Sequence, residues 1–221
     1  MTGVQTCALP ISNVQCGFPL TYYFSVEAQD IGIKTDPVDI ADAYKPIIAV
    51  ASMETFYDDF ETDLGWTSGG TATGGDWERG TPVGNGSYGD PTDDYNGSGQ
   101  CYLTGNSAGD SDIDGGSVWL ESPVFDLSNS GGGEIVFAAW FNTSVGPNPL
   151  QDVMTVSISN NNGADWVLAK TIGPTENASG GWLVHSFIAG DFVSPSNQMK
   201  IRFVAADAGG SSWVEIGRAH V

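Results

Sequence analysis

The chain has 221 residues, with seven Lys and Arg against 27 Asp and Glu, and a formal net charge of -20. This length is enough for one large domain or two modest ones, and the charge disfavours nucleic acid and anionic membranes as partners. The 30 glycines, the 11% aromatic content and the lack of a long apolar run indicate a turn-rich, β-forming chain without membrane insertion.

Both ends of the chain differ in character from the rest. The string MTGVQTCALPIS at positions 1–12 has no basic n-region and no cleavage site, so it does not fit a signal peptide. It resembles a translated sequencing adapter, and EIGRAHV at 215–221 resembles the complementary adapter read outward. We therefore expect both strings to be artefacts, and the natural polypeptide to be a metagenomic fragment running from about Asn13 to Val214.

The first natural segment contains one clear strand pattern. From Pro19 to Ala28 aromatic or apolar residues alternate with polar ones, which predicts a half-buried strand, and the following DIGIKTDPVD predicts a turn and loop. With its Cys16-Gly17 turn, this segment resembles the last strands of bacterial immunoglobulin-like or fibronectin-like modules. The resemblance implies that residues 13–47 are the C-terminal fragment of such a domain, with a linker.

A second unit begins near Glu54. Its candidate strands are short, separated by clusters of Gly, Pro, Asn, Asp and Ser, and no long segment keeps a helical period, which predicts a sandwich or jelly roll. A polar stretch from Gly65 to Gly99 is too long for an ordinary connection and is expected to be functional or held by ions. The predicted strands are Thr55 to Phe60, Gly99 to Thr104, Ser117 to Leu120, Glu134 to Asn142, Asp152 to Asn160, Trp166 to Ile172, Gly181 to Ile188 and Met199 to Ala205.

Several strings in this unit follow one another in the order known from a family of secreted bacterial jelly-roll modules. They include DDFETDLGW, DWERGTP, SDIDGGSVWLESPVFDL and GGWLVHSF. On them the unit resembles modules related to MAM and concanavalin-like domains. The resemblance implies an all-β, jelly-roll β-sandwich over residues 54–214, extracellular, and lacking its last strand.

One acidic string has the spacing of a calcium loop. Asp110, Asp112 and Asp114 alternate, Gly115 permits a tight reversal, and Glu121 follows seven residues after Asp114. Alternating carboxylates supply the hard oxygen donors that calcium prefers. The flanks predict strands rather than helices, so the site would be a β-loop, and a solvated acidic turn is the alternative.

Other acidic residues divide between ligands and solvated loops. The resemblance implies that Asp59 and Glu61 also hold a structural calcium that ties the first strand to the last. A further cluster, Asp90, Asp93 and Asp94, is interpreted as loop solvation.

The aromatic residues also fall into two groups. Trp77, Tyr88 and Tyr95 lie in the long polar stretch, where they could stack on sugar rings or pack within the loop. The second group lies within or beside predicted strands and is expected in the core, namely Trp119, Trp140, Trp166 and Trp182.

Two smaller motifs predict structural roles. Ser159, Asn161, Gly163 and Trp166 resemble an Asp-box hairpin, in which the Asx side chain caps the turn, glycine takes a positive φ and the indole plugs the hairpin. His185 lies in an apolar strand and is expected to be a core or sheet-face residue.

We expect no catalytic residue in this chain. The strings that match a nucleophile elbow or a dinucleotide loop lack the required helices, and zinc ligands do not cluster. The sequence therefore predicts a non-catalytic, calcium-stabilised binding or adhesion module, directed at a polysaccharide or cell-surface glycan, from a larger secreted protein. The alternatives are a substrate-docking part of a secreted peptidase or glycoside hydrolase, and a structural spacer.

Overall fold

The structure is a computed structural model. It describes residues 54–87, 89–107, 112–146 and 149–207 with their side chains, and residues 24–28, 32–36 and 215–219 as backbone. The chain divides into two units, residues 1–54 and 55–221. Among the described residues, no helix is long and apolar enough to cross a membrane.

The described part of the first unit is one antiparallel hairpin. Strand β1 (Phe24–Ala28) lies within the predicted strand and pairs with β2 (Gly32–Asp36). The sequence predicted turn and loop over the second of these segments, so β2 corrects that prediction. Its backbone pairs along all five residues of β1, and this pairing stabilises a segment whose own pattern is weak.

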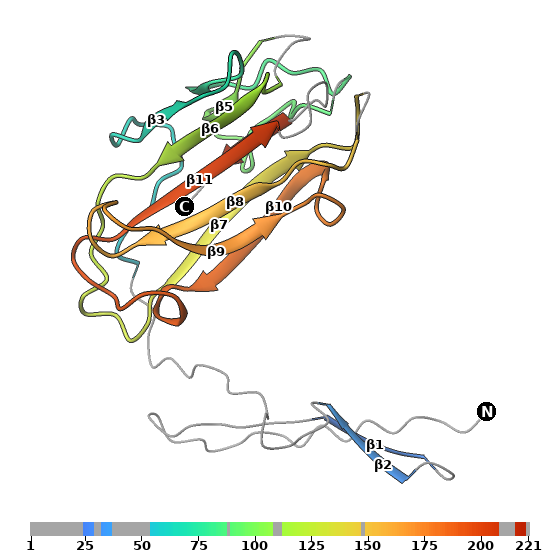
Figure 1. Cartoon of the computed structure of the whole chain (residues 1–221), viewed down its shortest axis with the longest axis vertical. Coiled ribbons are helices and arrows are strands. Elements are labelled where there is room, and N and C mark those ends of the chain that lie inside the picture. The colour runs from blue at the N-terminus through green and yellow to red at the C-terminus, as the bar shows by residue number, and fades with distance from the viewer. Residues whose placement is uncertain are drawn as a thin grey trace. The chain divides into compact units, whose positions relative to one another are not determined.

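The second unit is a sandwich of two five-stranded antiparallel sheets (Figure 1). Sheet I has the order β10-β7-β12-β5-β4, and sheet II has the order β3-β6-β11-β8-β9. The strands are β3 (Thr67–Gly70), β4 (Trp77–Gly80), β5 (Cys101–Thr104), β6 (Gly116–Glu121), β7 (Glu134–Asn142), β8 (Met154–Ser159), β9 (Val167–Ile172), β10 (Ser179–Ile188), β11 (Lys200–Asp207) and β12 (Glu215–Ala219). The prediction of an all-β sandwich is confirmed.

Alternation along the strands builds the core between the two sheets. In β11, buried residues alternate with half-buried ones, so that Ile201 and Phe203 face inward. Phe137 on β7 meets Phe203 edge to face across the sandwich, with ring centroids 5.2 Å apart. Burial of such apolar surface is the main force that holds the two layers together.

The beginning of the second unit differs from the prediction. Residues 55–60 form no strand in the structure. Phe60 instead has a positive φ of 64°, and the Asp58 carboxylate accepts hydrogen bonds from the Phe60 amide at 2.8 Å and the Trp66 indole at 2.7 Å. Phe60 is fully buried and packs edge to face on both Trp66 and Tyr102. A side-chain turn therefore replaces the expected strand and directs Phe60 into the core.

Strand β12 occupies the middle of sheet I, between β7 and β5. Glu215 pairs with Asn142, and Gly217 pairs with both Trp140 and Leu103. The sequence reading set this segment aside as adapter-encoded and expected the last strand to be absent. A strand in this position satisfies the backbone donors and acceptors of two neighbours, a function that depends little on its side chains.

Candidate functional site

The polar segment that contains Gly89 and Asp93 is hydrogen-bonded across the outer face of sheet I. The Trp140 indole donates to the Gly89 carbonyl at 2.7 Å, and the Trp182 indole donates to the Asp93 carbonyl at 3.0 Å. Gly89 has a φ of 91°, and a Cβ there would collide with the Asn142 amide, so only glycine fits. The segment is therefore positioned by the two strands beneath it, β7 and β10.

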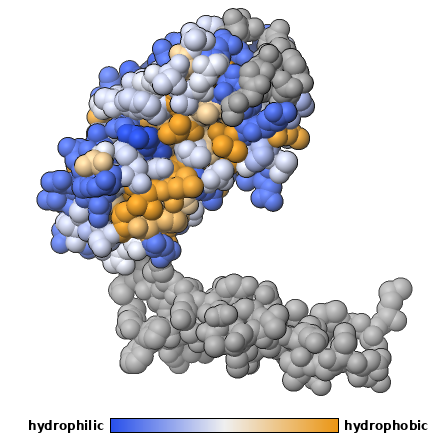
Figure 2. Space-filling model, viewed as in Figure 1, coloured by the Kyte–Doolittle hydropathy of each residue, from blue (hydrophilic) through white to orange (hydrophobic). Residues whose placement is uncertain are grey.

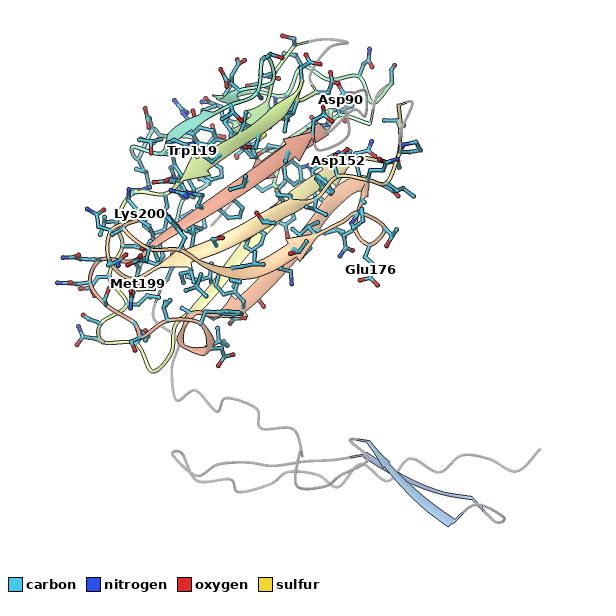
Figure 3. All side chains as sticks on the ribbon, in the orientation of Figure 1. Asp90, Trp119, Asp152, Glu176, Met199 and Lys200 are labelled. Atoms are coloured by element: carbon cyan, nitrogen blue, oxygen red, sulfur yellow. The ribbon has the colours of Figure 1, made fainter. Side chains whose placement is uncertain are left out.

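Side-chain turns hold the same segment from within. Asp90 accepts a hydrogen bond from the Asn85 amide at 3.0 Å, and Asp94 accepts from the Ser98 amide and hydroxyl at 3.1 and 2.9 Å. Asp90 and Asp94 are 3% and 5% exposed, so the reading of these two as solvated loop residues is wrong. Figure 3 shows Asp90 at the same end of the sandwich as Asp152, which lies just before the start of β8. Asp93, by contrast, is exposed.

Three aromatic rings meet where this segment crosses β7 and β10. Tyr95 is 41% exposed, and its ring lies 6.2 Å from that of Trp182, edge to face. Trp182 in turn meets Trp140 edge to face at 5.9 Å. We call these three residues the Tyr95 cluster. Because both indole N–H groups are bonded to the backbone, the rings are held in fixed orientations with part of their surface in solvent.

A bulge in β10 leaves open space beside the cluster. The register between β10 and β7 shifts between Ser179 and Trp182, and Gly180 and Gly181 have φ values of 76° and 92°. Trp140 packs over Gly180, whereas apart from the two adjacent residues no heavy atom lies within 4 Å of the Cβ position at Gly181. The cluster therefore borders free surface on which a ligand ring could stack.

The predicted aromatic ligand residues have three different outcomes. Tyr95 is exposed and belongs to the cluster. Trp77 begins β4 and is 5% exposed in the core, so its prediction as a loop platform is wrong. Tyr88 lies outside the described residues. Trp140 and Trp182 were expected in the core, but they pair with each other on the outer face of sheet I; because β7 is apolar on both faces, its sequence has no alternation that marks the buried face.

The predicted calcium ligands Asp59 and Glu61 are engaged in local hydrogen bonds. Asp59 accepts from the Glu61 amide at 3.2 Å, and Glu61 accepts from the Gln100 amide at 2.6 Å. The latter contact connects the first turn to the residue before β5. Each carboxylate uses one oxygen in these hydrogen bonds.

The second predicted calcium loop is described only in part. Asp112 is half-buried and Asp114 is exposed, while Ile113 between them is fully buried. The Gly115 amide donates to Asp207 at 3.0 Å, which brings the end of β11 to this loop. Asp110 lies outside the described residues. Within the described part of the chain, no three His, Cys, Asp or Glu side chains are gathered in the way a metal site requires.

The hairpin between β8 and β9 has the predicted structural role. Asn161 accepts hydrogen bonds from the Asp165 amide at 3.0 Å and the Ser159 hydroxyl at 2.8 Å, and Gly163 has a φ of 85°. Trp166 packs against Gly163. The prediction of a capped, indole-plugged turn is therefore confirmed.

On the outer face of sheet II, Arg202 makes cation–π contacts and an ion pair. The Arg202 guanidinium lies 4.1 Å from the ring centroid of Trp166 and 5.8 Å from that of Trp119, and it pairs with Glu121. Lys200 contacts the same carboxylate at 3.5 Å. Figure 3 shows Trp119 and Lys200 on this face, and Figure 2 shows polar surface over β11 next to apolar surface over β9.

His185 has the burial that its sequence context predicts. It is 8% exposed on β10, with its ring centroid 5.3 Å from that of Phe137. Burial, and then the positive charge of Lys170, lower the pKa of the imidazole from its usual value. The neutral form is therefore favoured in the folded protein.

Comparisons with known proteins address the fold. No protein-family model and no curated protein matches the sequence. Among solved structures, one is similar over 92% of this chain and 75% of its own length, with a TM-score of 0.52 and 13% identity. It was reported for the promiscuous specificity of carbohydrate-binding modules of the β-sandwich superfamily. The fold is that of a β-sandwich module.

A second solved structure is similar over the sandwich. It is a cleaved adhesin domain of Lys-gingipain from Porphyromonas gingivalis, with a TM-score of 0.50 and 16% identity, and it is matched over 97% of its length and 76% of this chain. At such identities, the two likenesses establish the architecture and leave the function to the site itself.

Proposed function

We propose that this chain is a non-catalytic glycan-binding module of a larger extracellular protein, and that the Tyr95 cluster is its binding site. The observation that carries the proposal is the exposed Tyr95 ring beside Trp182, with the indole N–H groups of Trp182 and Trp140 bonded to the backbone. Rings fixed in this way lose little freedom on binding, which favours stacking against the apolar face of a sugar.

The arrangement of the site supports binding rather than catalysis. Asp90 and Asp94 are the two buried carboxylates of the polar segment over sheet I, and they cap its turns. General acid–base hydrolysis of a glycoside needs two carboxyl groups facing each other across the bond to be cleaved. The aromatic surface, in contrast, is of the kind on which binding energy concentrates in Trp and Tyr side chains.

Replacing Trp182 by alanine tests the proposal. We expect the variant to lose at least about 30-fold in affinity for the bound glycan, the loss typical of a central aromatic contact of about 2 kcal/mol. Affinity electrophoresis against a panel of soluble polysaccharides identifies the ligand class, and calorimetric titration measures the loss. Trp119→Ala, which removes a partly exposed indole from sheet II, is the matched control.

The proposal is refuted if none of the polysaccharides in the panel retards the unaltered protein in affinity electrophoresis. Equal losses in the Trp182 and Trp119 variants would also refute it, because they would show that the binding surface does not lie at the Tyr95 cluster.

We further propose that calcium stabilises the module, as the family resemblance implies. The support is the oxygen chemistry of the side chains of Asp112 and Asp114, whose loop is joined to Asp207 through the Gly115 amide, and of Asp59 and Glu61. The expected result is a higher melting temperature in calcium than in a chelator, with binding heat in calorimetry. An unchanged melting temperature in calcium at ten times its dissociation constant, where about 1.4 kcal/mol of stabilisation is expected, would refute it.

A further inference from the structure

The outer face of sheet I continues beyond the Tyr95 cluster as a strip along β7 and β10. Ile135 and Phe137 on β7 point into the core, so the residues between them point outward. Val136 and Val184 on this outer side are 44% and 57% exposed. The outward rows pair Trp182 with Trp140, Val184 with Ala138, Ser186 with Val136, and Ile188 with Glu134.

The strip is long, narrow and mostly apolar. From Trp182 to Ile188 it spans six residue steps, about 20 Å at about 3.4 Å per step. A single exposed valine is ordinary on a protein surface, but two in line with a cluster of fixed aromatic rings form a patch of the kind that binds ligands. Its shape fits a linear polymer lying parallel to the strands.

The charges at the two ends of the strip are negative. Asp93 is exposed beside the Tyr95 cluster, and Glu134 is exposed at the other end, in the last outward row. Both side chains are therefore in solvent, one near each end of the strip. The strip therefore has an apolar centre and one carboxylate near each end.

The cations whose side chains the structure describes are held away from the strip, and Arg218, described as backbone, lies on β12 beside β7. Arg79 donates to the Phe60 carbonyl and the Gln100 amide oxygen, and Lys200 and Arg202 pair with Glu121 on the other sheet. Lys170 lies on β9 of sheet II, near His185, which faces inward from β10. In a chain of formal net charge -20, the carboxylates at the two ends of the strip favour cationic ligands over polyanions.

We propose that the strip binds a linear polymer of amino sugars with protonated amines. The apolar ring faces would lie on Trp182 and Val184, and the ammonium groups would meet Asp93 and Glu134. This inference rests on the proposed glycan-binding function and adds the charge class of the ligand. Polymers of uronic acids are repelled by the same carboxylates.

Three oligosaccharides of equal length distinguish the charge classes: a glucosamine hexamer, an N-acetylglucosamine hexamer and a hexagalacturonate. Calorimetric titration of the full 221-residue chain at pH 6 and low ionic strength should give the tightest binding for the glucosamine hexamer, about fivefold tighter than for its acetylated form. Added salt should reduce this preference, because surface charge pairs are screened.

Two sets of variants locate the effect. The double variant D93N and E134Q should bring the two hexosamine ligands within twofold of each other and leave binding of the acetylated form unchanged. The matched control, D63N and D165N, removes two exposed carboxylates elsewhere in the unit and should keep the fivefold preference. Val184→Ser should weaken both ligands about threefold, whereas Leu168→Ser, at a 55% exposed site on β9, should weaken neither.

The outcomes separate the two proposals. If the acetylated hexamer or hexagalacturonate binds as tightly as the glucosamine hexamer through Trp182, the charge class is wrong and the glycan-binding function stands. If the glucosamine hexamer does bind more tightly but the D93N and E134Q variant keeps that preference, the strip is the wrong location for it. If no carbohydrate binds in a Trp182-dependent way, the glycan-binding function itself fails.

Discussion

Asp58 is the buried polar group on which the first turn of the sandwich depends most directly. It is 3% exposed, and its two carboxylate oxygens accept hydrogen bonds from the Phe60 amide and the Trp66 indole. Replacing it by alanine leaves both donors without this acceptor inside the protein. The same change releases the positive φ of Phe60, a conformation that costs a non-glycine residue about 1–2 kcal/mol and that the Asp58 turn maintains.

The expected loss follows from these contacts. A buried donor left without a partner costs about 1–3 kcal/mol, so two donors cost about 2–6 kcal/mol, with a central value of about 4 kcal/mol. For a unit of this size, each kcal/mol lowers the melting temperature by about 2–4 °C, which gives a decrease of about 8–16 °C. Asp58→Asn keeps one acceptor and presents an N–H group to the other donor, so we expect about half of that loss.

Urea unfolding followed by tryptophan fluorescence and calorimetric scanning measure both variants. Asp63→Ala is the matched control, because Asp63 caps the Gly65 amide by the same kind of turn at 2.9 Å in an exposed position. We expect that control to lose less than about 0.5 kcal/mol, since water replaces the lost acceptor. The reasoning is refuted if Asp58→Ala is no more destabilised than Asp63→Ala.

Three further predictions concern the hairpin, the outer face of sheet II and the buried histidine. Asn161→Ala should lower the free energy of unfolding by about 1 kcal/mol in urea titration, because the Asp165 amide and the Ser159 hydroxyl lose their acceptor. Arg202→Lys keeps the charge but loses the planar group over Trp166 and should cost about 1 kcal/mol in the same assay; a gain in stability would contradict the cation–π assignment. Because burial lowers the pKa of His185, its contribution to stability should be complete above the unfolded pKa of about 6.5 and decrease as pH falls below it. Melting temperatures from pH 7.5 to 5.5 should therefore fall less steeply in His185→Gln, and equal slopes would contradict the burial argument.

The regular strands could be predicted because their signal is local. The apolar run VFAAWF marked a central strand at Glu134–Asn142, with the bounds that β7 has in the structure. Strands β3 and β4 have the sequences TSGG and WERG, which carry no such pattern. They form because β6 and β5 pair with them, and such long-range pairing cannot be read from a four-residue string.

The candidate site could be predicted only in part, for a related reason. Tyr95 lies in a polar stretch, where it could stack on sugar rings or pack within the loop, and in the structure its side chain is 41% exposed. Trp140 and Trp182 lie on strands, where large aromatic residues usually face the core. In sheet I these two face outward and are partly covered by the segment that contains Gly89 and Asp93, and this cover depends on hydrogen bonds over about 50 and 90 residues of sequence.

The position of β12 also has a consequence for how the sandwich is assembled. The pairs β4–β5 and β7–β10 are joined within sheet I only through β12, which is the last described strand in the chain. In a chain without that segment, β5 and β7 would present two open edges to pairing with a strand from another chain. We therefore expect a variant that lacks residues 215–221 to exchange strands and form dimers, whereas among the described strands the sheet that contains β12 has its edges at β10 and β4.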